Sequence, residues 1–137
     1  MISAISTCGK FIYHLRNSGF QGIHMADFLR KILKTFPRRK IILVWDGATA
    51  HSSKEVKELL AMLQPGRLEL YKQPAHSPEL NPDEQVWKYL KAESTLRNLA
   101  CKSFKELRGH LIREIEQLEN NPDRIVKMFH HPECGFY

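Results

Sequence analysis

The sequence predicts a single layered α/β domain, and three observations support this. Runs of β-prone residues alternate with amphipathic helical patterns along the chain. One of these runs, residues 41–45, is apolar throughout, which is typical of a strand covered on both faces. The chain has 137 residues, 42% hydrophobic and 26% charged, enough for one core without disulfides or a structural metal.

The first elements are a predicted hairpin and a helix. Residues 2–6 and 10–15 are β-prone, and Gly9 between them can adopt the positive φ that a tight connection needs. A helix that Pro37 closes follows, with apolar residues at helical spacing: Met25, Phe28, Leu29, Ile32, Leu33 and Phe36. The strand at 41–45 comes next.

A strand-helix-strand unit occupies the middle of the chain. Ser52 and Glu55 have the spacing of a capping box, and the helix behind them should run to the Pro65-Gly66 turn. Residues 68–72 form the next predicted strand. Residues 73–82 should be an extended loop rather than a helix or strand, because prolines interrupt them: Pro74, Pro78 and Pro82.

Helical patterns fill the rest of the chain. Asn81 as N-cap and Pro82 at the first helical position predict a third helix. Ser103 with Glu106 predicts a fourth, with an apolar stripe of Phe104, Leu107, Leu111, Ile115 and Leu118. Residues 123–129 predict one more short helix.

Charge and cysteine content narrow the functional classes. Lys and Arg (21) exceed Asp and Glu (15), and the net charge of +6 favours a polyanionic partner, although the basic residues are scattered. No apolar run approaches the roughly 20 residues of a membrane span, so we expect no membrane association. Three separated cysteines suit free thiols in a reducing cytosol: Cys8, Cys101 and Cys134.

Two carboxylates are the candidate catalytic and metal-binding groups. Asp46 follows a buried strand, where open α/β sheets place ligands, although an ordinary Asp-Gly turn is the alternative. Glu84 lies in a first helical turn, where it could instead cap the N–H of Asn81. A strand end and a nearby helix are where metal-dependent phosphoryl-transfer sites place the carboxylates that hold Mg²⁺.

Two stretches carry a family resemblance. They are VWDGATAH at 44–51 and SPELNPDEQVWKYLK at 77–91. They resemble the DDE transposases of the mariner-like bacterial insertion-sequence group, in which an Asp-Asn-Ala-x-x-His block precedes a Ser-Pro-x-Leu-Asn-Pro-x-Glu block and a Trp-containing helix. The second block matches closely, whereas Gly47 replaces the usual Asn and His76 replaces a common Tyr.

The resemblance implies a ribonuclease-H-like, retroviral-integrase-like fold, a mixed sheet flanked by helices. Residues 1–129 would be a truncated DDE transposase catalytic domain, and 130–137 an irregular tail. Asp46 matches the second catalytic aspartate and Glu84 the final catalytic glutamate. Both would bind Mg²⁺, with Mn²⁺ as a substitute. The first aspartate and its central strand have no counterpart here, so we expect the chain alone to be inactive.

The resemblance also implies an activity and partners. An intact family member would hydrolyse a phosphodiester at the element end, and the new 3′-hydroxyl would attack target DNA. The implied partners are transposon ends, target DNA, possible further copies of the chain and the upstream half of a split transposase, in the bacterial cytosol or nucleoid. The alternative is a non-catalytic DNA- or partner-binding fragment, or an inactive remnant. A second reading frame, a misassigned start and a degraded copy all stay open as origins.

Other residues have competing interpretations. Lys88 and Lys91 are candidate DNA contacts on the helix of Glu84, but a solvated helix face predicts the same lysines. His51 could approach the site or simply precede a helix cap. The zinc-ligand types near the C-terminus indicate a tail rather than a zinc site, because no paired Cys-x-x-Cys unit accompanies them: His130, His131 and Cys134.

Overall fold

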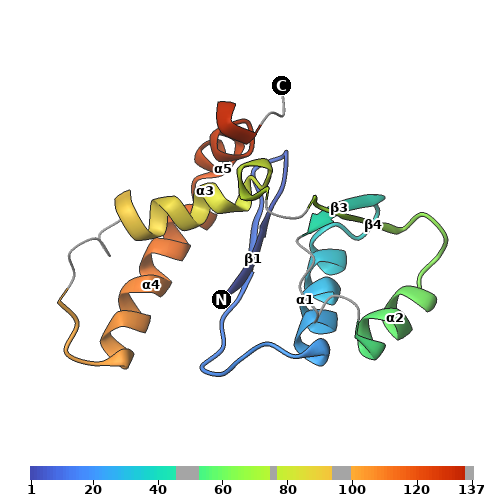
Figure 1. The fold of residues 1–137 in the computed structure, drawn as a ribbon, viewed down its shortest axis with the longest axis horizontal. Helices are drawn as coiled ribbons and strands as arrows, with labels where there is room; N and C mark the ends of the chain where they lie inside the picture. The colour runs from blue at the N-terminus through green and yellow to red at the C-terminus, as the bar shows by residue number, and fades with distance from the viewer. Residues whose placement is uncertain (46–52, 75–76, 94–99, 135–137) are drawn as a thin grey trace. The chain divides into compact units, whose positions relative to one another are not determined.

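The structure is a computed structural model that describes residues 1–45, 53–74, 77–93 and 100–134 (Figure 1). The predicted hairpin is present at its N-terminus. β1 (Ile2–Ile5) pairs with β2 (Phe11–His14) in a two-stranded sheet. The N–H of Ser6 donates to the carbonyl of Lys10 at 3.0 Å, and Gly9 has φ +80°. A Cβ at Gly9 would lie 2.7 Å from the carbonyl oxygen of Pro122, so both the turn and its packing require glycine.

The chain divides into two compact units. One contains Met1–Ile2 and Tyr13–Ser77, and the other contains Ser3–Ile12 and Pro78–Tyr137. Residues of the hairpin therefore belong to both units. Each unit is described separately below.

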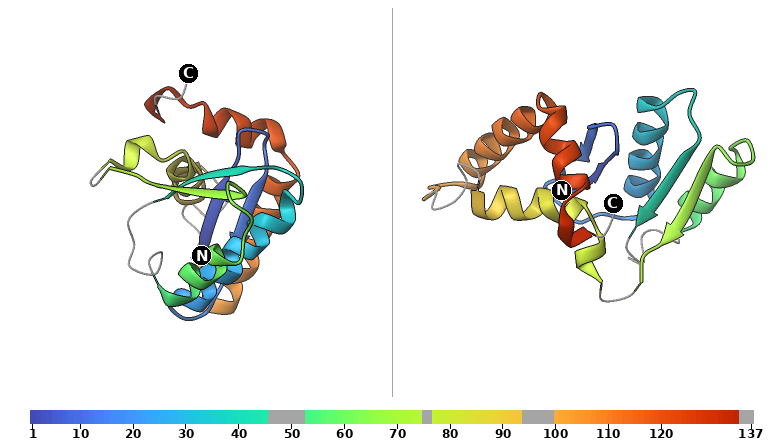
Figure 2. Two further views of the ribbon diagram at one scale, coloured as in Figure 1. Left: turned by 90° about the vertical axis from the view of Figure 1, so that its right-hand side faces the viewer. Right: turned by 90° about the horizontal axis from the view of Figure 1, so that it is seen from above.

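The first unit contains a helix followed by a strand-helix-strand segment. Its elements are α1 (Gly22–Thr35), β3 (Ile41–Trp45), α2 (Lys54–Ala61) and β4 (Leu68–Lys72). β3 and β4 are parallel, in a register that runs from Ile41 opposite Leu68 to Trp45 opposite Lys72, and they run side by side in both views of Figure 2. A parallel pair requires a crossover connection, and α2 supplies it. α1 contacts α2.

Arg67 fixes the C-terminal end of α1. Its Nη2 donates to the carbonyls of Leu33 and Phe36 at 3.1 and 2.7 Å, and its Nη1 donates to the carbonyl of Arg39. The last carbonyls of a helix have no partner within the helix. The guanidinium supplies that partner and joins α1 to the start of β4.

The prediction that the strand at 41–45 is covered on both faces is wrong. Ile42 is 69% exposed and Val44 49% exposed, and Tyr71 on the same face of β4 is 54% exposed. An apolar run indicates that both faces of a parallel strand need to be covered by other elements. It does not indicate that those elements are present. No described residue covers this face.

The second unit is helical apart from the hairpin residues. It contains α3 (Asp83–Lys88), a π-helical turn (Tyr89–Glu93), α4 (Phe104–Glu119) and α5 (Pro122–Phe129). α5 contacts both α3 and α4. The fully buried side chains on these three helices include Val86, Ile115, Leu118 and Ile125.

Helix boundaries differ slightly from the predictions. Ser53 rather than Ser52 caps α2: its Oγ accepts from the N–H of Val56 at 3.3 Å, whereas Ser52 lies outside the described residues. α2 ends at Ala61, before the Pro65-Gly66 turn. The predicted cap of α4 is confirmed, because the Oγ of Ser103 accepts from the N–H of Glu106 at 3.2 Å.

Two short 3-10 turns occur in segments where the sequence predicted no helix. Pro78–Leu80 lies within the proline-rich loop, and Pro132–Cys134 lies near the C-terminus. Cys134 is buried. The apolar stripe of α4 also differs from expectation, because Phe104 and Leu107 at its N-terminal end are exposed while its C-terminal half is buried.

In the described part of the chain, the strands form two two-stranded sheets, whereas one mixed sheet was predicted. The expected fold places a further strand between the hairpin and β3, and β2 and β3 do not pair with each other within the described ranges. In the same part of the chain, no helix has the length and apolar character needed to cross a membrane.

Candidate functional site

The carboxyl-terminal edge of the β3–β4 sheet leads directly to Asp46. The carbonyl of Trp45 accepts from the N–H of Gln73 at 2.8 Å, which extends the pairing one residue beyond Lys72. Parallel strands place their carboxyl ends at one edge, where α/β sheets bind ligands. Asp46 itself lies outside the described residues, as does His51, so the position of each side chain stays a prediction.

Gln73 stabilises the loop that leaves this edge, and the sequence did not single it out. It is only 8% exposed, and its Nε2 donates to the carbonyl of Ser77. A buried amide of this kind needs partners, because an unpaired one costs free energy. Its only signal in the sequence is a polar residue directly after an apolar strand.

Glu84 lies in the first turn of α3, which Asn81 caps. The Oδ1 of Asn81 accepts from the N–H of Asp83 at 3.1 Å, and its carbonyl accepts from the N–H of Glu84 at 3.0 Å. The N–H of Asn81 donates in turn to the carbonyl of Pro78 at 3.0 Å. The predicted cap is therefore correct in its chemistry, although the helix begins one residue later than expected.

The carboxylate of Glu84 has no structural partner in the described part of the chain. The side chain is half-buried and makes no hydrogen bond or ion pair there. The capping alternative required its carboxylate to accept from the N–H of Asn81. That bond is absent among the described residues, so capping does not explain Glu84.

A hydrogen bond joins the hairpin to the residue beside Glu84. The Oγ of Ser3 on β1 donates to Oδ2 of Asp83 at 2.8 Å, within the second unit. This bond fixes the first turn of α3 against the strand. Nothing in the sequence indicated it, because the two residues are far apart along the chain.

Polar groups also fix the buried face of α3. The hydroxyl of Tyr89 donates to Oε2 of Glu114 at 3.0 Å, and the guanidinium of Arg124 lies 4.7 Å from the Tyr89 ring centroid. Burial, and then Glu114, raises the pKa of the Tyr89 phenol. Glu114 is only 1% exposed. In the sequence, Glu114 could have been noticed as a charged residue within the apolar stripe of α4.

The two lysines predicted to contact DNA lie on α3 and on the π-helical turn that continues it. Glu84, Trp87, Lys88 and Lys91 are spaced at i, i+3, i+4 and i+7, and both lysines are exposed. The Nζ of Lys91 lies 5.7 Å from the Trp87 ring centroid. The helix changes to π geometry at Tyr89, and π-helical turns occur frequently at functional sites.

The predicted carboxylate pair is not brought together by any described contact. Asp46 is outside the described ranges, and Glu84 belongs to the second unit. Among the described residues, no group of three His, Cys, Asp or Glu side chains could bind a metal ion. The chemistry of the pair nevertheless suits Mg²⁺ or Mn²⁺, which prefer carboxylate oxygens.

Comparison with protein families places most of the chain in a known family. Residues 1–108 match the family described as DDE superfamily endonuclease. No curated protein sequence matches the chain.

Three solved structures of similar fold are those of Mos1 mariner transposase. The crystal structure of the catalytic domain of Mos1 mariner transposase matches with TM-score 0.61 and 17% identity, over 94% of this chain and 71% of that one. The Mos1 transposase paired-end complex with left transposon end matches with TM-score 0.59 and 17% identity, over 94% and 43%.

A third structure, the Mos1 mariner paired end complex with Mn, matches with TM-score 0.59 and 16% identity, over 94% and 42%. The chain thus spans less than half of each chain in the two complexes. At these identities the likeness shows the fold, and it confirms the predicted ribonuclease-H-like class.

Proposed function

The chain belongs to the DDE superfamily endonucleases, and from this we propose that it is part of the catalytic domain of a DNA transposase. Its chemistry would be metal-dependent hydrolysis of a phosphodiester followed by strand transfer. Asp46 and Glu84 would supply two of the carboxylates that hold the metal. The DNA would be transposon ends and target DNA, in the cytosol or nucleoid.

One observation carries this proposal: the Glu84 carboxylate has no partner among the described residues. The N–H of Asn81, which a capping glutamate would address, donates instead to the carbonyl of Pro78. A half-buried carboxylate without a structural partner is suited to bind a cation. Its position in the motif that matches the family's final glutamate supports the same assignment.

Bound Mg²⁺, or Mn²⁺ in its place, would supply electrophilic stabilisation of the attacking and leaving oxygens. The residues of this chain would place the ligands. The Ser3–Asp83 hydrogen bond and the Asn81 cap orient the first turn of α3, and with it Glu84. Lys88 and Lys91 on the same helix would contact backbone phosphates, which positions DNA without reading its sequence.

The Mos1 complexes support the choice of partner. One contains a transposon end and another contains Mn. We propose by analogy that this chain acts on DNA ends, within an assembly that includes further copies or an upstream polypeptide. Two carboxylates rarely complete a two-metal site, so the assembly would supply the rest.

Calorimetric titration with Mn²⁺ tests the metal assignment. We expect the chain to bind Mn²⁺, and Asp46→Asn and Glu84→Gln each to weaken binding by at least about tenfold, because even changes outside the ligand sphere reach that size. Glu79→Gln is the matched control, because Glu79 is an exposed carboxylate in the turn before α3. Equal affinities in all four proteins would overturn the assignment.

Nicking of supercoiled plasmid in Mg²⁺ or Mn²⁺ separates the proposal from its alternative. Cleavage by this chain that is lost in Asp46→Asn and Glu84→Gln, and kept in Glu79→Gln, would rule out a non-catalytic fragment. Salt-sensitive DNA binding without metal binding or cleavage would favour a DNA- or partner-binding fragment. DNA and metal binding without cleavage is the result expected when a further carboxylate must come from the assembly.

A further inference from the structure

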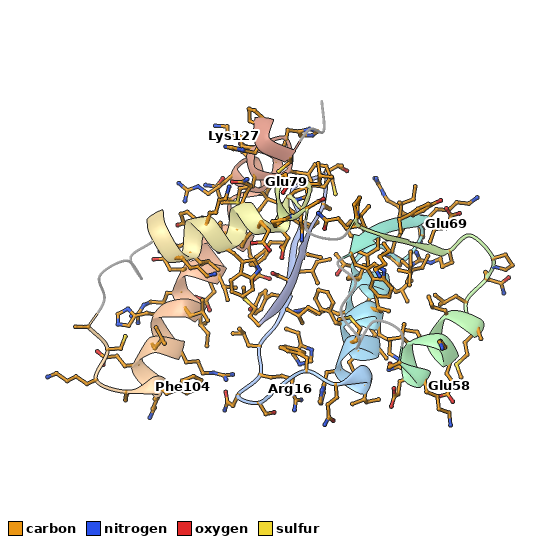
Figure 3. All side chains as sticks on the ribbon, viewed as in Figure 1. Arg16, Glu58, Glu69, Glu79, Phe104 and Lys127 are labelled. Carbon is orange, nitrogen blue, oxygen red and sulfur yellow. The ribbon has the colours of Figure 1, made fainter. Side chains whose placement is uncertain are left out.

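Basic side chains gather where β2 ends and α1 begins, within the first unit. His14 is the last residue of β2, Arg16 lies in the following loop, and His24 and Lys31 lie on α1. Figure 3 labels Arg16 on this segment. We call these four residues the His14 cluster. The function proposed above makes no use of them.

Phe20 sets the spacing of the two imidazoles in the cluster. Its ring centroid lies 5.8 Å from that of His14 and 6.4 Å from that of His24, both in edge-to-face geometry. The N–H of Gln21 donates to Nδ1 of His24 at 3.0 Å. In the neutral ring this bond places the proton on Nε2, so the Nε2–H of His24 remains a donor.

Lys31 and Arg16, the permanently charged residues of the cluster, have N–H groups that remain available as hydrogen-bond donors. The Nζ of Lys31 donates to the carbonyl of Tyr13 at 2.7 Å, which uses one of its three protons. The Nη2 of Arg16 donates to the Oγ of Ser18 at 2.9 Å. The other N–H groups of the Arg16 guanidinium have no hydrogen-bond partner among the described residues.

The charge around His14 is positive. Among the described residues, Asp27 is the acidic group that acts on His14, and it pairs with Arg30 at 2.9 Å. Burial lowers the pKa of His14, and the charges of Arg16 and Lys31 lower it further. In the described part of the chain, the cationic groups of the cluster therefore outnumber the one carboxylate that acts on it.

We propose that the His14 cluster binds one phosphate group of a DNA backbone, an inference that rests on the proposed function and adds a contact distinct from Lys88 and Lys91. The guanidinium of Arg16 and the Nε2–H of His24 would donate to the two free oxygens of a phosphodiester. Lys31 would contribute its charge. Such a contact would fix the register of the DNA rather than select a sequence.

Fluorescence anisotropy with a labelled DNA duplex, measured over a range of salt concentrations, tests the site. We expect Arg16→Gln and Lys31→Gln each to weaken binding about fivefold to tenfold at roughly 0.1 M salt. The Arg16→Gln/Lys31→Gln double variant should also reduce the slope of log K against log salt by about 0.9, the value for one lost phosphate contact. Lys34→Gln is the matched control, since Lys34 is exposed on the same helix and does not act on His14.

Imidazole NMR signals give a second readout, with histidines assigned by His14→Gln and His24→Gln. We expect these two signals to shift when the duplex is added. Equal salt slopes in all variants, no DNA binding by the parent chain, or shifts caused by inorganic phosphate and not by DNA would each overturn the inference. Metal binding by Asp46 and Glu84 is measured without DNA, so failure of the proposed function is detected separately.

Discussion

At the level of single residues, buried polar groups hold α3 in place. Glu114 lies among apolar side chains and is matched by the hydroxyl of Tyr89, whose ring in turn packs under Arg124. A buried carboxylate is costly unless hydrogen bonds satisfy it. The Tyr89–Glu114 pair therefore determines how the helix that carries Glu84 packs, from positions away from Glu84 itself.

Tyr89→Phe tests this pair. The change removes a hydrogen bond to a buried carboxylate, so we expect the free energy of unfolding to fall by about 1.5–3 kcal/mol in urea denaturation. Tyr71→Phe is the control, because the Tyr71 hydroxyl bonds Glu69 at an exposed position. That change should cost less than about 0.5 kcal/mol. Similar losses in the two variants would show that the Tyr89 bond has no special role.

His14 should make stability depend on pH. Its pKa in the folded chain lies below the ordinary value of 6.5, first because of burial and then because of Arg16 and Lys31. The unfolded chain therefore binds more protons in this range, and stability falls as the pH drops below about 6.5. We expect a lower Tm at about pH 5.5 than at about pH 7.5, with a smaller difference in His14→Gln. An unchanged difference would exclude His14 as its source.

At the level of helices and strands, features that depend on local interactions were predictable from the sequence, and features that depend on tertiary contacts were not. Helices and strands were predictable because periodicity and caps are local, as the Ser103 cap of α4 shows. Adjacent serines at 52 and 53 could not be ranked by spacing alone. The π-helical turn at Tyr89 and the Ser3–Asp83 bond depend on tertiary contacts, so no local pattern reveals them.

The candidate site was predictable to a similar degree. The motif around Glu84 made it a candidate, and among the described residues its carboxylate does not cap α3, so its role stays a prediction. Gln73 escaped notice because one polar residue after a strand is ordinary in sequence. The geometry of Asp46 with Glu84 remains a prediction.

Arg67 provides a prediction about an element, the end of α1. Arg67→Met keeps the aliphatic stem but removes the donors to Leu33 and Phe36. We expect a loss of about 1–2 kcal/mol in unfolding free energy, and faster amide exchange in the last turn of α1. Arg39→Met, at an exposed position, is the control. Unchanged exchange in Arg67→Met would show that the guanidinium does not stabilise the helix end.

At the scale of the whole chain, the division into two compact units predicts that unfolding is not cooperative. The strands form two separate sheets, and each unit has its own set of internal contacts. The exposed Ile42 and Val44 leave a parallel pair of strands uncovered on one face. We therefore expect the two units to differ in stability, in contrast to a single two-state domain.

The two tryptophans allow this to be measured, because Trp45 lies in one unit and Trp87 in the other. Urea unfolding of Trp45→Phe and Trp87→Phe, followed by the fluorescence of the remaining tryptophan, should give different midpoints. Coincident midpoints and slopes, confirmed by far-UV circular dichroism of the parent chain, would show one cooperative unit instead.

Whether one metal ion joins the two units can be tested by paramagnetic broadening of amide NMR signals with Mn²⁺. If Asp46 and Glu84 bind the same ion, signals around both residues broaden together, and Glu84→Gln removes the broadening at both. Glu79→Gln should leave it unchanged. Broadening around one of the two alone, or broadening that Glu84→Gln does not alter, would contradict a shared metal site and with it the proposed chemistry.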